Sequence, residues 1–559
     1  MPRKMPVGVD DFKKLVESKY YFADKTHFIK ELLDKSAEVT LITRPRRFGK
    51  TLNLSMLYYF FNIENAAQNR ELFNGLHIEQ AGGEYVQEQG TRPVIFFTFK
   101  DIKQRTWQSE TEKIANILSA LYREYLFLAD SPRLTEIDRE NFCAIYKKNA
   151  SLTDMEDAVF NLCRMLATHY GKKPVLLLDE YDTPIISAWH NHYYDDCITF
   201  MRNFFGAALK NNLYLDFAVL TGITRVSKES IFSGLNNLDV CSVLSDFYAD
   251  CFGFTPADAE KLLTDCGLAD KMPELRQWYD GYNFGGQEIY NPWSVINFVH
   301  KGCKFQPYWI NVSDNAILKD VLRHVDLRRR EELEKLLVGK TVKSTVNENI
   351  VYADLATNRD SLYMLLLYTG YLKAVSVRET VGDMELVNLQ IPNYEVRRAY
   401  KQEILQYVVP RQGITLLHEM LNAMISGNTE EFADRLGTLL KDYISYNDTA
   451  RNPECFYHGL LLGLSVLMEG EYRIESNRES GYGRFDMAFF PLVQATPGVI
   501  WEIKTAKSEN ELEQAAQTAL MQIDAKDYAN ELKRQGIADI WRYGVAICGK
   551  NVTIRGKID

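Results

Sequence analysis

This sequence has no long hydrophobic runs. No stretch approaches the roughly 18 consecutive apolar residues that a membrane-spanning helix needs. The N-terminus, MPRKMPVGVDDF, lacks the apolar core of a signal peptide. Low-complexity segments and internal repeats are missing too. These absences argue against an integral membrane protein and a repeat protein, and we expect a cytoplasmic protein that does not contact a membrane.

Paired cysteines and an excess of basic charge are missing as well. The nine cysteines are scattered without any Cys-x-x-Cys pair, so neither a disulfide framework nor a zinc site is indicated. The net charge is -10. Indiscriminate binding to nucleic acid depends on neutralising phosphates with basic residues, which this balance does not favour. We therefore expect any nucleic-acid site to be a local basic patch.

The chain has the composition of a folded protein, with 46% hydrophobic and 25% charged residues. Its 559 residues exceed what one hydrophobic core normally serves, which predicts several domains. Short apolar runs alternate with helical patterns in the first 250 residues, which indicates a mostly parallel α/β sheet. The expected strands are Val39–Thr43, Pro93–Phe99, Pro174–Leu178 and Leu215–Leu220.

Two further regions follow this α/β region. Residues 251–445 have a predominantly helical pattern that is interrupted by aromatic turns at Tyr279–Gly286 and Tyr290–Trp293. Residues 446–559 predict a small α+β domain, and the sequence as a whole therefore predicts domains at 1–250, 251–445 and 446–559. In the third domain we expect a helix over Tyr457–Met468, strands at Tyr472–Glu475, Phe485–Phe490 and Val499–Lys504, and a last helix.

The segment RPRRFGKT (Arg44–Thr51) lies between the first expected strand and a helical pattern over Leu52–Phe61. A strand, a loop ending in Gly-Lys-Thr and a helix together supply backbone N–H donors, a cation and a magnesium-binding hydroxyl to a nucleotide phosphate. Arg44 replaces the usual first glycine, and Pro45 restricts the loop. The alternative is a basic loop whose arginines are merely solvated. The candidate nucleotide-binding residues are Arg46, Arg47, Gly49, Lys50 and Thr51.

Acidic residues follow the third expected strand, where a phosphate site needs carboxylates for magnesium and for the attacking water. Asp179 is the candidate magnesium ligand together with Thr51, and Glu180 is the candidate water-activating base. Arg225, just beyond the fourth strand, is a candidate sensor of the γ-phosphate. The alternatives are a polar turn that includes Asp182, and an ordinary surface position for Arg225.

Near the C-terminus, Asp486, Glu502 and Lys504 provide the groups that magnesium-dependent phosphodiester hydrolysis needs. Glu502 and Lys504 are two residues apart, so on a strand they face the same side, and Trp501 faces the other. A hairpin turn centred near Gln494 places Asp486 opposite Glu502 within a residue or two. The sequence therefore predicts a catalytic metal site with Asp486 and Glu502 as ligands.

Two further residues are candidates for the same site. Glu454 and His458 are four residues apart on the expected helix, so Glu454 can complete the metal shell, although a surface pair is the alternative. Gln522 lies on the last helical stretch, where its amide can bind a nucleic-acid phosphate or the catalytic lysine. An ordinary position on the helix surface is the alternative for Gln522.

With both sites placed, nearly the whole chain resembles bacterial proteins that join an AAA-ATPase-like N-terminal domain to a C-terminal PD-(D/E)XK nuclease-superfamily domain. The strings that carry the resemblance are TRPRRFGKT (Thr43–Thr51), LLLDEYDTP (Leu176–Pro184), LTGITRVSKESIFSGLNNL (Leu220–Leu238), YNPWSVINF (Tyr290–Phe298), IPNYEV (Ile391–Val396), FYHGLLLGL (Phe456–Leu464), GYGRFDMA (Gly481–Ala488) and EIK (Glu502–Lys504).

The resemblance implies a role for each matching residue. Lys50 and Thr51 would bind phosphate and magnesium, Asp179 and Glu180 would form the metal and water-orienting pair, and Arg225 would sense the nucleotide. The arginine-proline start of the loop is what this family shows. In the nuclease fold the matching positions are the acidic residue of the helix, the metal aspartate, the E-x-K pair and the glutamine of the following helix, here Glu454, Asp486, Glu502, Lys504 and Gln522.

Three functions are consistent with these features. The first is an enzyme in which ATP regulates a magnesium-dependent nuclease acting on DNA. The second is a nucleotide-dependent switch or DNA-binding protein whose nuclease fold does not cut, because a fold does not guarantee an activity. The third is an interaction protein whose aromatic middle region binds other proteins.

Overall fold

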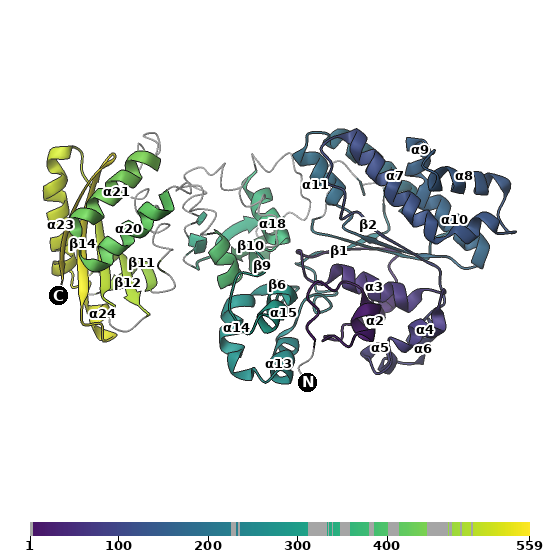
Figure 1. Ribbon diagram of the computed structural model, residues 1–559, viewed down its shortest axis with the longest axis horizontal. Coiled ribbons are helices and arrows are strands. Elements are labelled where there is room, and N and C mark those ends of the chain that lie inside the picture. Colours follow the sequence, from purple (N-terminus) through teal and green to yellow (C-terminus); the bar gives the residue numbers. More distant parts are fainter. Residues whose placement is uncertain are drawn as a thin grey trace. The chain divides into compact units, whose positions relative to one another are not determined.

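The structure is a computed structural model that describes residues 4–224, 231–232, 235–310, 332–333, 335–337, 339–346, 358–379, 385–400, 413–443, 468, 472–480, 483–492 and 496–558 (Figure 1). The chain forms two compact units. The first combines Met1–Asp314 with Lys343–Val396, and the second combines Asn315–Val342 with Arg397–Asp559. The boundaries between the three predicted domains stay predictions. Within the described ranges, no helix is long and apolar enough to cross a bilayer.

The N-terminal part of the first unit contains the predicted parallel sheet. Its five strands run in the order β2-β3-β4-β1-β5, and every neighbouring pair is parallel. Four of these strands overlap the four apolar runs, so the predicted α/β fold is confirmed. The strands are β1 (Val39–Thr43), β2 (Val94–Thr98), β3 (Val175–Asp179), β4 (Ala218–Gly222) and β5 (Leu238–Cys241).

Alternate residues of these strands enter two separate cores, because successive side chains of a strand face opposite sides of the sheet. Leu41 and Leu176 enter one core, which α7 (Trp107–Glu124), α8 (Glu136–Tyr146), α10 (Ala158–Tyr170), α11 (Thr183–His190) and α12 (Tyr194–Leu209) cover. Ile42 and Leu177 enter the other core, which α1 (Phe12–Glu17), α2 (His27–Lys35) and α3 (Lys50–Phe61) cover. The sheet is therefore the middle layer of three. Shorter helices of this part are α4 (Ala66–Glu71), α5 (His77–Gln80), α6 (Gly83–Gln87) and α9 (Leu152–Glu156).

The middle of the chain is helical, as predicted, and it also contains short strands that the sequence pattern did not indicate. Its helices are α13 (Pro256–Asp265), α14 (Met272–Tyr279), α15 (Pro292–His300) and α18 (Arg359–Thr369). A hairpin of β6 (Tyr282–Phe284) and β7 (Gln287–Ile289) lies within the predicted aromatic turn. A separate sheet has the order β8-β10-β9, formed by β8 (Val342–Thr345), β9 (Lys373–Glu379) and β10 (Glu385–Gln390).

A buried carboxyl group lies in this middle part and gives a pH-dependent prediction. Glu395 is fully buried and accepts hydrogen bonds from the Ser294 hydroxyl (2.7 Å) and the Trp309 backbone N–H (2.5 Å). Burial raises the pKa of Glu395 to about 8, and these hydrogen bonds only partly oppose the shift.

Stability contributed by the proton on Glu395 should be lost as the pH rises. In the unfolded chain the carboxyl group has its ordinary pKa near 4.5, so the native state binds the proton more tightly. This stabilisation is complete below about pH 4.5 and is lost as the pH rises to about 8. As the pH rises from 5 to 9, the unfolding temperature of the wild type should therefore decrease more than that of Glu395→Gln. Calorimetry measures both unfolding temperatures. Parallel pH profiles for the two proteins would contradict the assignment.

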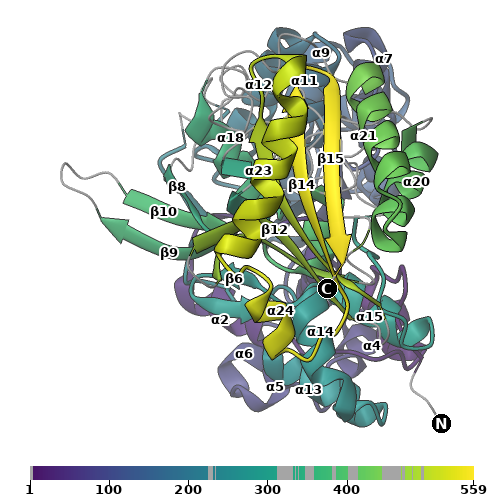
Figure 2. The same cartoon turned by 90° about the vertical axis from the view of Figure 1, so that its left-hand side faces the viewer.

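The second unit contains a five-stranded mixed sheet in the order β11-β12-β13-β14-β15 (Figure 2). The β13 and β14 strands are parallel, and the other neighbouring pairs are antiparallel. The three strands predicted here are confirmed, and the expected helix over Tyr457–Met468 lies outside the described residues except for Met468. The strands are β11 (Tyr472–Ser480), β12 (Gly483–Pro491), β13 (Gly498–Thr505), β14 (Ile540–Cys548) and β15 (Asn551–Ile558).

Helices cover both faces of this mixed sheet. On one face, Trp501 and Ile503 pack with α20 (Gly413–Ser426) and α21 (Thr429–Tyr443). On the other face, Ala488 and Ile500 pack with α23 (Leu512–Ala525) and α24 (Asn530–Arg534). Because side chains alternate along a strand, Glu502 and Lys504 of β13 lie on the face that α23 covers.

Candidate nucleotide and nuclease sites

The loop after β1 turns from the sheet into α3 at Gly49. Gly49 caps the N-terminus of α3 with a φ of 87°, a left-handed conformation that favours glycine. Arg47 also has a positive φ of 70°. This turn leaves the first backbone N–H groups of α3 without partners inside the helix, which is the arrangement that binds an anion. The predicted strand, loop and helix are therefore all present.

Lys50 is the first residue of α3, and its ammonium group is buried beneath the loop. Its Nζ donates hydrogen bonds to the carbonyl oxygens of Arg44 (2.8 Å) and Pro45 (2.9 Å). Burial lowers the pKa of Lys50, and nearby carboxylates, Glu180 first, oppose that shift. The loop therefore holds a cation next to the N-terminus of α3.

Arg44, which replaces the first glycine of the common phosphate-loop pattern, has a structural role. Its guanidinium group is fully buried and donates to the carbonyl oxygens of Cys241 (2.9 Å), Ser242 (2.8 Å) and Tyr248 (3.2 Å). Burial lowers the pKa of Arg44 to about 10. All of these acceptors lie at the end of β5 or just after it. Arg44 therefore links the loop to the segment that follows β5.

The other two arginines of the loop meet aromatic residues of the middle region. The guanidinium of Arg47 lies 4.5 Å from the centroid of the Trp293 ring on α15. The Trp309 indole Nε1 donates to the backbone oxygen of Arg46 over 3.1 Å. Sequence reasoning missed both tryptophans as neighbours of the loop, because nothing in their local spacing relates them to it.

Asp179 ends β3 and lies close to the start of α3. It is fully buried and accepts hydrogen bonds from the hydroxyls of Thr51 (2.6 Å) and Thr221 (2.5 Å). Burial raises the pKa of Asp179, while these hydrogen bonds oppose the shift. Glu180 follows with a positive φ of 52° and accepts from the Thr183 hydroxyl over 3.2 Å. A hydroxyl and a carboxylate side by side are ligands that Mg²⁺ prefers.

Asp182 organises the same region, although the sequence pattern indicated it only as part of a polar turn. It is fully buried and accepts from the backbone N–H groups of Ile223 and Thr224, both at 2.9 Å. Its other oxygen, Oδ1, is buried without a hydrogen bond from any described residue. Asp182 thus fixes the backbone that leaves β4. Arg225, the predicted sensor, comes next in the chain and lies outside the described residues.

In the second unit, the register of β12 and β13 agrees with the predicted hairpin. Met487 pairs with Trp501 and Ala488 pairs with Ile500. Continuing the ladder by one residue sets Asp486 opposite Glu502. The backbone N–H of Ile503 donates to Asp486 Oδ2 over 2.8 Å. The two acidic side chains therefore share one face of the sheet.

Glu502 is the buried centre of this acidic group. Its Oε1 atom accepts from Lys504 Nζ over 3.5 Å and from the Gln522 amide. Its Oε2 atom is buried and has no hydrogen bond of normal geometry from the described residues. Burial and the negative charge of Asp486 together raise the pKa of Glu502 to about 8, while Lys504 and a hydrogen bond from the Asp486 backbone partly oppose the shift. An unsatisfied carboxylate oxygen next to a second carboxylate fits a divalent cation.

The α23 helix brings Gln522 to the acidic group. Ala516 and Ala519 of α23 are fully buried, and small residues at this interface let the helix approach the sheet closely. Tyr528, a buried residue just beyond the helix, has its hydroxyl 3.5 Å from Gln522 Nε2. Sequence reasoning missed Tyr528, since a lone tyrosine after a helix carries no signal. Glu454, the remaining predicted ligand, lies outside the described residues.

Gly544 on β14 sets how closely α23 packs. A Cβ atom at Gly544 would overlap the backbone oxygen of Ala516 and the backbone nitrogen of Leu520. We expect Gly544→Ala to destabilise the second unit by about 1–3 kcal/mol, as overpacking usually does. The matched control is Gly437→Ala on α21, where nothing lies within 4 Å of the added methyl group. Denaturant unfolding checks both, and equal stability of the two variants would contradict this packing.

The two units thus contain two recognisable classes of fold. One is a phosphate-loop NTPase-type sheet with Gly-Lys-Thr after one strand and an acidic pair after another. The other is a mixed sheet that presents two carboxylates and a lysine beneath a helix. Residues 6–232 match the family described as predicted AAA-ATPase, and residues 452–557 match the PD-(D/E)XK nuclease superfamily. The N-terminal part of this chain is therefore an AAA-ATPase-like domain and its C-terminal part is a PD-(D/E)XK nuclease-superfamily domain, which confirms the resemblance seen in the sequence.

The likeness to a known protein extends over nearly the whole chain. The chain is similar to an uncharacterized protein encoded in the vnfD 5' region of Azotobacter chroococcum mcd 1. The two are 28% identical over 554 residues, which cover 96% of this chain and 94% of the relative. The similarity therefore includes both sites and the middle region between them.

Proposed function

We propose that this protein binds and hydrolyses ATP at the phosphate loop and cuts DNA at a magnesium-dependent site in its second unit. The observation that carries the nuclease half is the buried Glu502, which has one carboxylate oxygen without a described hydrogen-bond partner and lies beside Asp486 and Lys504. A structural ion pair alone would leave no reason to bury that oxygen unsatisfied.

Each residue of the nuclease site has a role that follows from its contacts. Asp486 and Glu502 would hold the metal ion, with Glu454 as a further ligand. The ion would supply Lewis-acid stabilisation of charge on the phosphate. The Lys504 ammonium, 3.5 Å from Glu502 Oε1, would orient the attacking water or stabilise developing negative charge. Gln522 would hold Glu502 in place through its amide hydrogen bond.

At the phosphate loop, the residues would exchange partners when nucleotide binds. The Lys50 ammonium now donates to two loop carbonyls, and phosphate oxygens are stronger acceptors for the same charge. Thr51 and Asp179 would hold magnesium, and the N–H groups of Gly49 and the first turn of α3 would bind phosphate oxygens. Arg46, Arg47 and Arg225 would add positive charge around the nucleotide.

Glu180 would act as the base that orients the attacking water. We expect Glu180→Gln to retain the ATP affinity of the wild type and to lower the hydrolysis rate at least about a hundredfold, the lower end of what a general base contributes. Steady-state phosphate release and nucleotide titration measure the two effects. Glu84→Gln, an exposed substitution on α6, serves as the control. Hydrolysis unchanged in Glu180→Gln would remove Glu180 from this role.

DNA is the proposed substrate of the second unit. Removal of divalent metal with a chelator should stop the cutting of plasmid DNA, and added magnesium should restore it. If the protein binds DNA but never cuts it, the result would instead favour a nucleotide-dependent switch that only binds DNA.

A further inference from the structure

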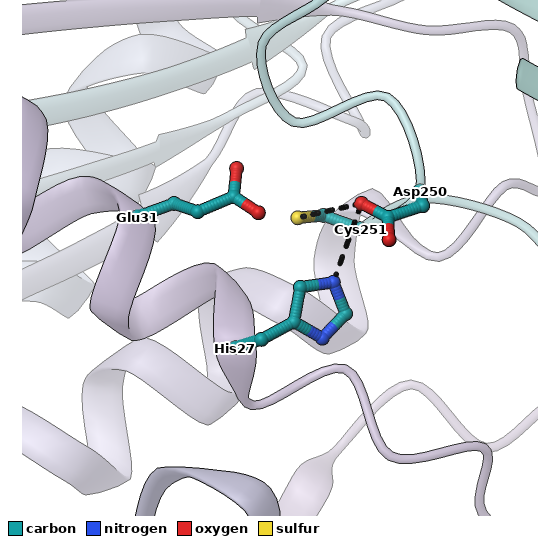
Figure 3. A group of neighbouring side chains, drawn as sticks. All are labelled: His27, Glu31, Asp250 and Cys251. Carbon is teal, nitrogen blue, oxygen red and sulfur yellow. Dashed lines mark hydrogen bonds and ion pairs between the residues drawn. The ribbon is translucent and has the colours of Figure 1, made fainter. Parts of the chain in front are cut away.

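Four metal-binding side chains meet at a place that is separate from both sites described above. His27 and Glu31 lie four residues apart on α2, so they project from the same face of that helix. Asp250 and Cys251 are adjacent in the segment after β5. Figure 3 shows all four side chains directed toward one another. One ligand atom from each lies within 4.8 Å of every other.

The spacing of these atoms is close to that of ligands around one ion. His27 Nε2 lies 3.4 Å from Asp250 Oδ1, and Cys251 Sγ lies 3.9 Å from the same oxygen. Ligands about 2.0–2.3 Å from a tetrahedral zinc ion lie about 3.3–3.7 Å from one another. His27 Nε2 is buried, and its 3.4 Å ion pair with Asp250 Oδ1 is longer than an ordinary N–H···O hydrogen bond.

We propose that His27, Glu31, Asp250 and Cys251 bind one divalent transition-metal ion, with zinc as the expected occupant. One imidazole nitrogen, two carboxylates and one thiolate form a mixed set that suits zinc. Mg²⁺ prefers oxygen ligands only, so the ion proposed for the catalytic sites is a poor match here. The Cys251 thiol would release its proton to solvent as the Sγ–metal bond forms.

The surroundings allow an ion to enter and to be retained. The Asp250 side chain is 48% exposed, which opens one side of the group to solvent. Cys251 is fully buried, so its sulfur would be shielded once it is bound. The carboxylates of Glu31 and Asp250 lie beside the buried Cys251 sulfur. A metal cation would counter this accumulation of negative charge.

Metal binding at this position would also stabilise the phosphate loop. The segment that supplies Asp250 and Cys251 also contacts the loop and α3. The Asn53 amide of α3 donates to the Cys251 backbone oxygen over 2.8 Å, and the Gly253 N–H donates to the Phe48 oxygen over 3.1 Å. An ion that joins α2 to this segment would therefore stabilise the AAA-ATPase-like domain without touching nucleotide.

Cobalt titration of the full-length protein tests the proposal, because Co²⁺ bound to a thiolate gives a charge-transfer absorption band. After treatment with a chelator, the wild type should bind one equivalent of Co²⁺ with that band, and Zn²⁺ should displace it. Cys251→Ser should lose the band, whereas Cys143→Ser, a half-buried cysteine on α8, should keep it. The residues proposed for the two catalytic sites include no cysteine, so loss of the band in Cys251→Ser assigns the ion to this site.

Two further variants keep the test decisive if Cys251→Ser folds poorly. His27→Gln and Glu31→Gln should each weaken Co²⁺ binding by more than about tenfold, since loss of even an outer-shell partner costs that much. His77→Gln is the matched control, because His77 is exposed and its ring centroid lies 6.5 Å from that of His27. No thiolate band in the wild type, or equal affinity in His27→Gln and His77→Gln, would overturn the proposal.

Discussion

Asp486→Asn is expected to lower magnesium-dependent DNA cleavage at least about a hundredfold, because the metal ion loses a charged ligand and with it several kcal/mol of charge stabilisation. Asparagine keeps an oxygen that can accept from the Ile503 backbone N–H, so the β12 to β13 hairpin should persist. Rates of plasmid nicking under single-turnover conditions measure the effect. Lys504→Ala should cause a loss of similar size.

The matched control for this change is Asp524→Asn on α23. Asp524 is partly exposed and forms ion pairs with Arg542 and Lys557 at the edge of the same domain. A surface change of this kind alters stability by roughly 0.5 kcal/mol or less, so cleavage should stay within about twofold of wild type. Equal cleavage by Asp486→Asn and Asp524→Asn would show that Asp486 is not a ligand of the reacting metal.

Lys50→Ala is expected to weaken ATP binding at least about tenfold, since a hydrogen bond to a charged group contributes roughly 1.5–3 kcal/mol. The loss should be larger when several phosphate oxygens contact the same ammonium. Equilibrium titration with a fluorescent ATP analogue measures the affinity. The nuclease domain should remain folded, because the substitution lies in the other compact unit.

Lys50 is buried, so its removal requires two controls. Lys50→Met keeps the apolar stem and tests whether the charge itself binds nucleotide. Lys30→Ala removes an exposed lysine that pairs with Asp34, and it should leave ATP affinity unchanged. Wild-type affinity in Lys50→Met would contradict the assignment of the loop.

The features that could be predicted from the sequence are those that depend on local patterns. Four apolar runs identified four strands of the parallel sheet, because fully buried parallel strands are continuous hydrophobic segments. The alternation of side chains around Trp501 and the expected turn near Gln494 were sufficient to predict that Asp486 lies opposite Glu502, in agreement with the strand register. The Gly-Lys-Thr triplet was placed correctly because it lies between a strand and a helix.

The features that could not be predicted depend on contacts between distant segments. The Arg44 guanidinium binds carbonyls about 200 residues later in the chain, with separations of 197 and 198 positions to Cys241 and Ser242. Trp309 reaches the loop from 263 positions away. The β6 and β7 strands of the middle region were missed because a strand of three residues is too short to show a periodicity.

The measurement that tests the central claim most directly is cleavage of supercoiled, linear and single-stranded DNA by the wild-type protein with Mg²⁺ or Mn²⁺. Each reaction is run with and without ATP, beside Asp486→Ala and Lys504→Ala. We predict nicks that require metal, a rate that changes with ATP, and loss of cutting in both variants. DNA that is bound but never cut, under every metal and nucleotide condition, would contradict the nuclease assignment.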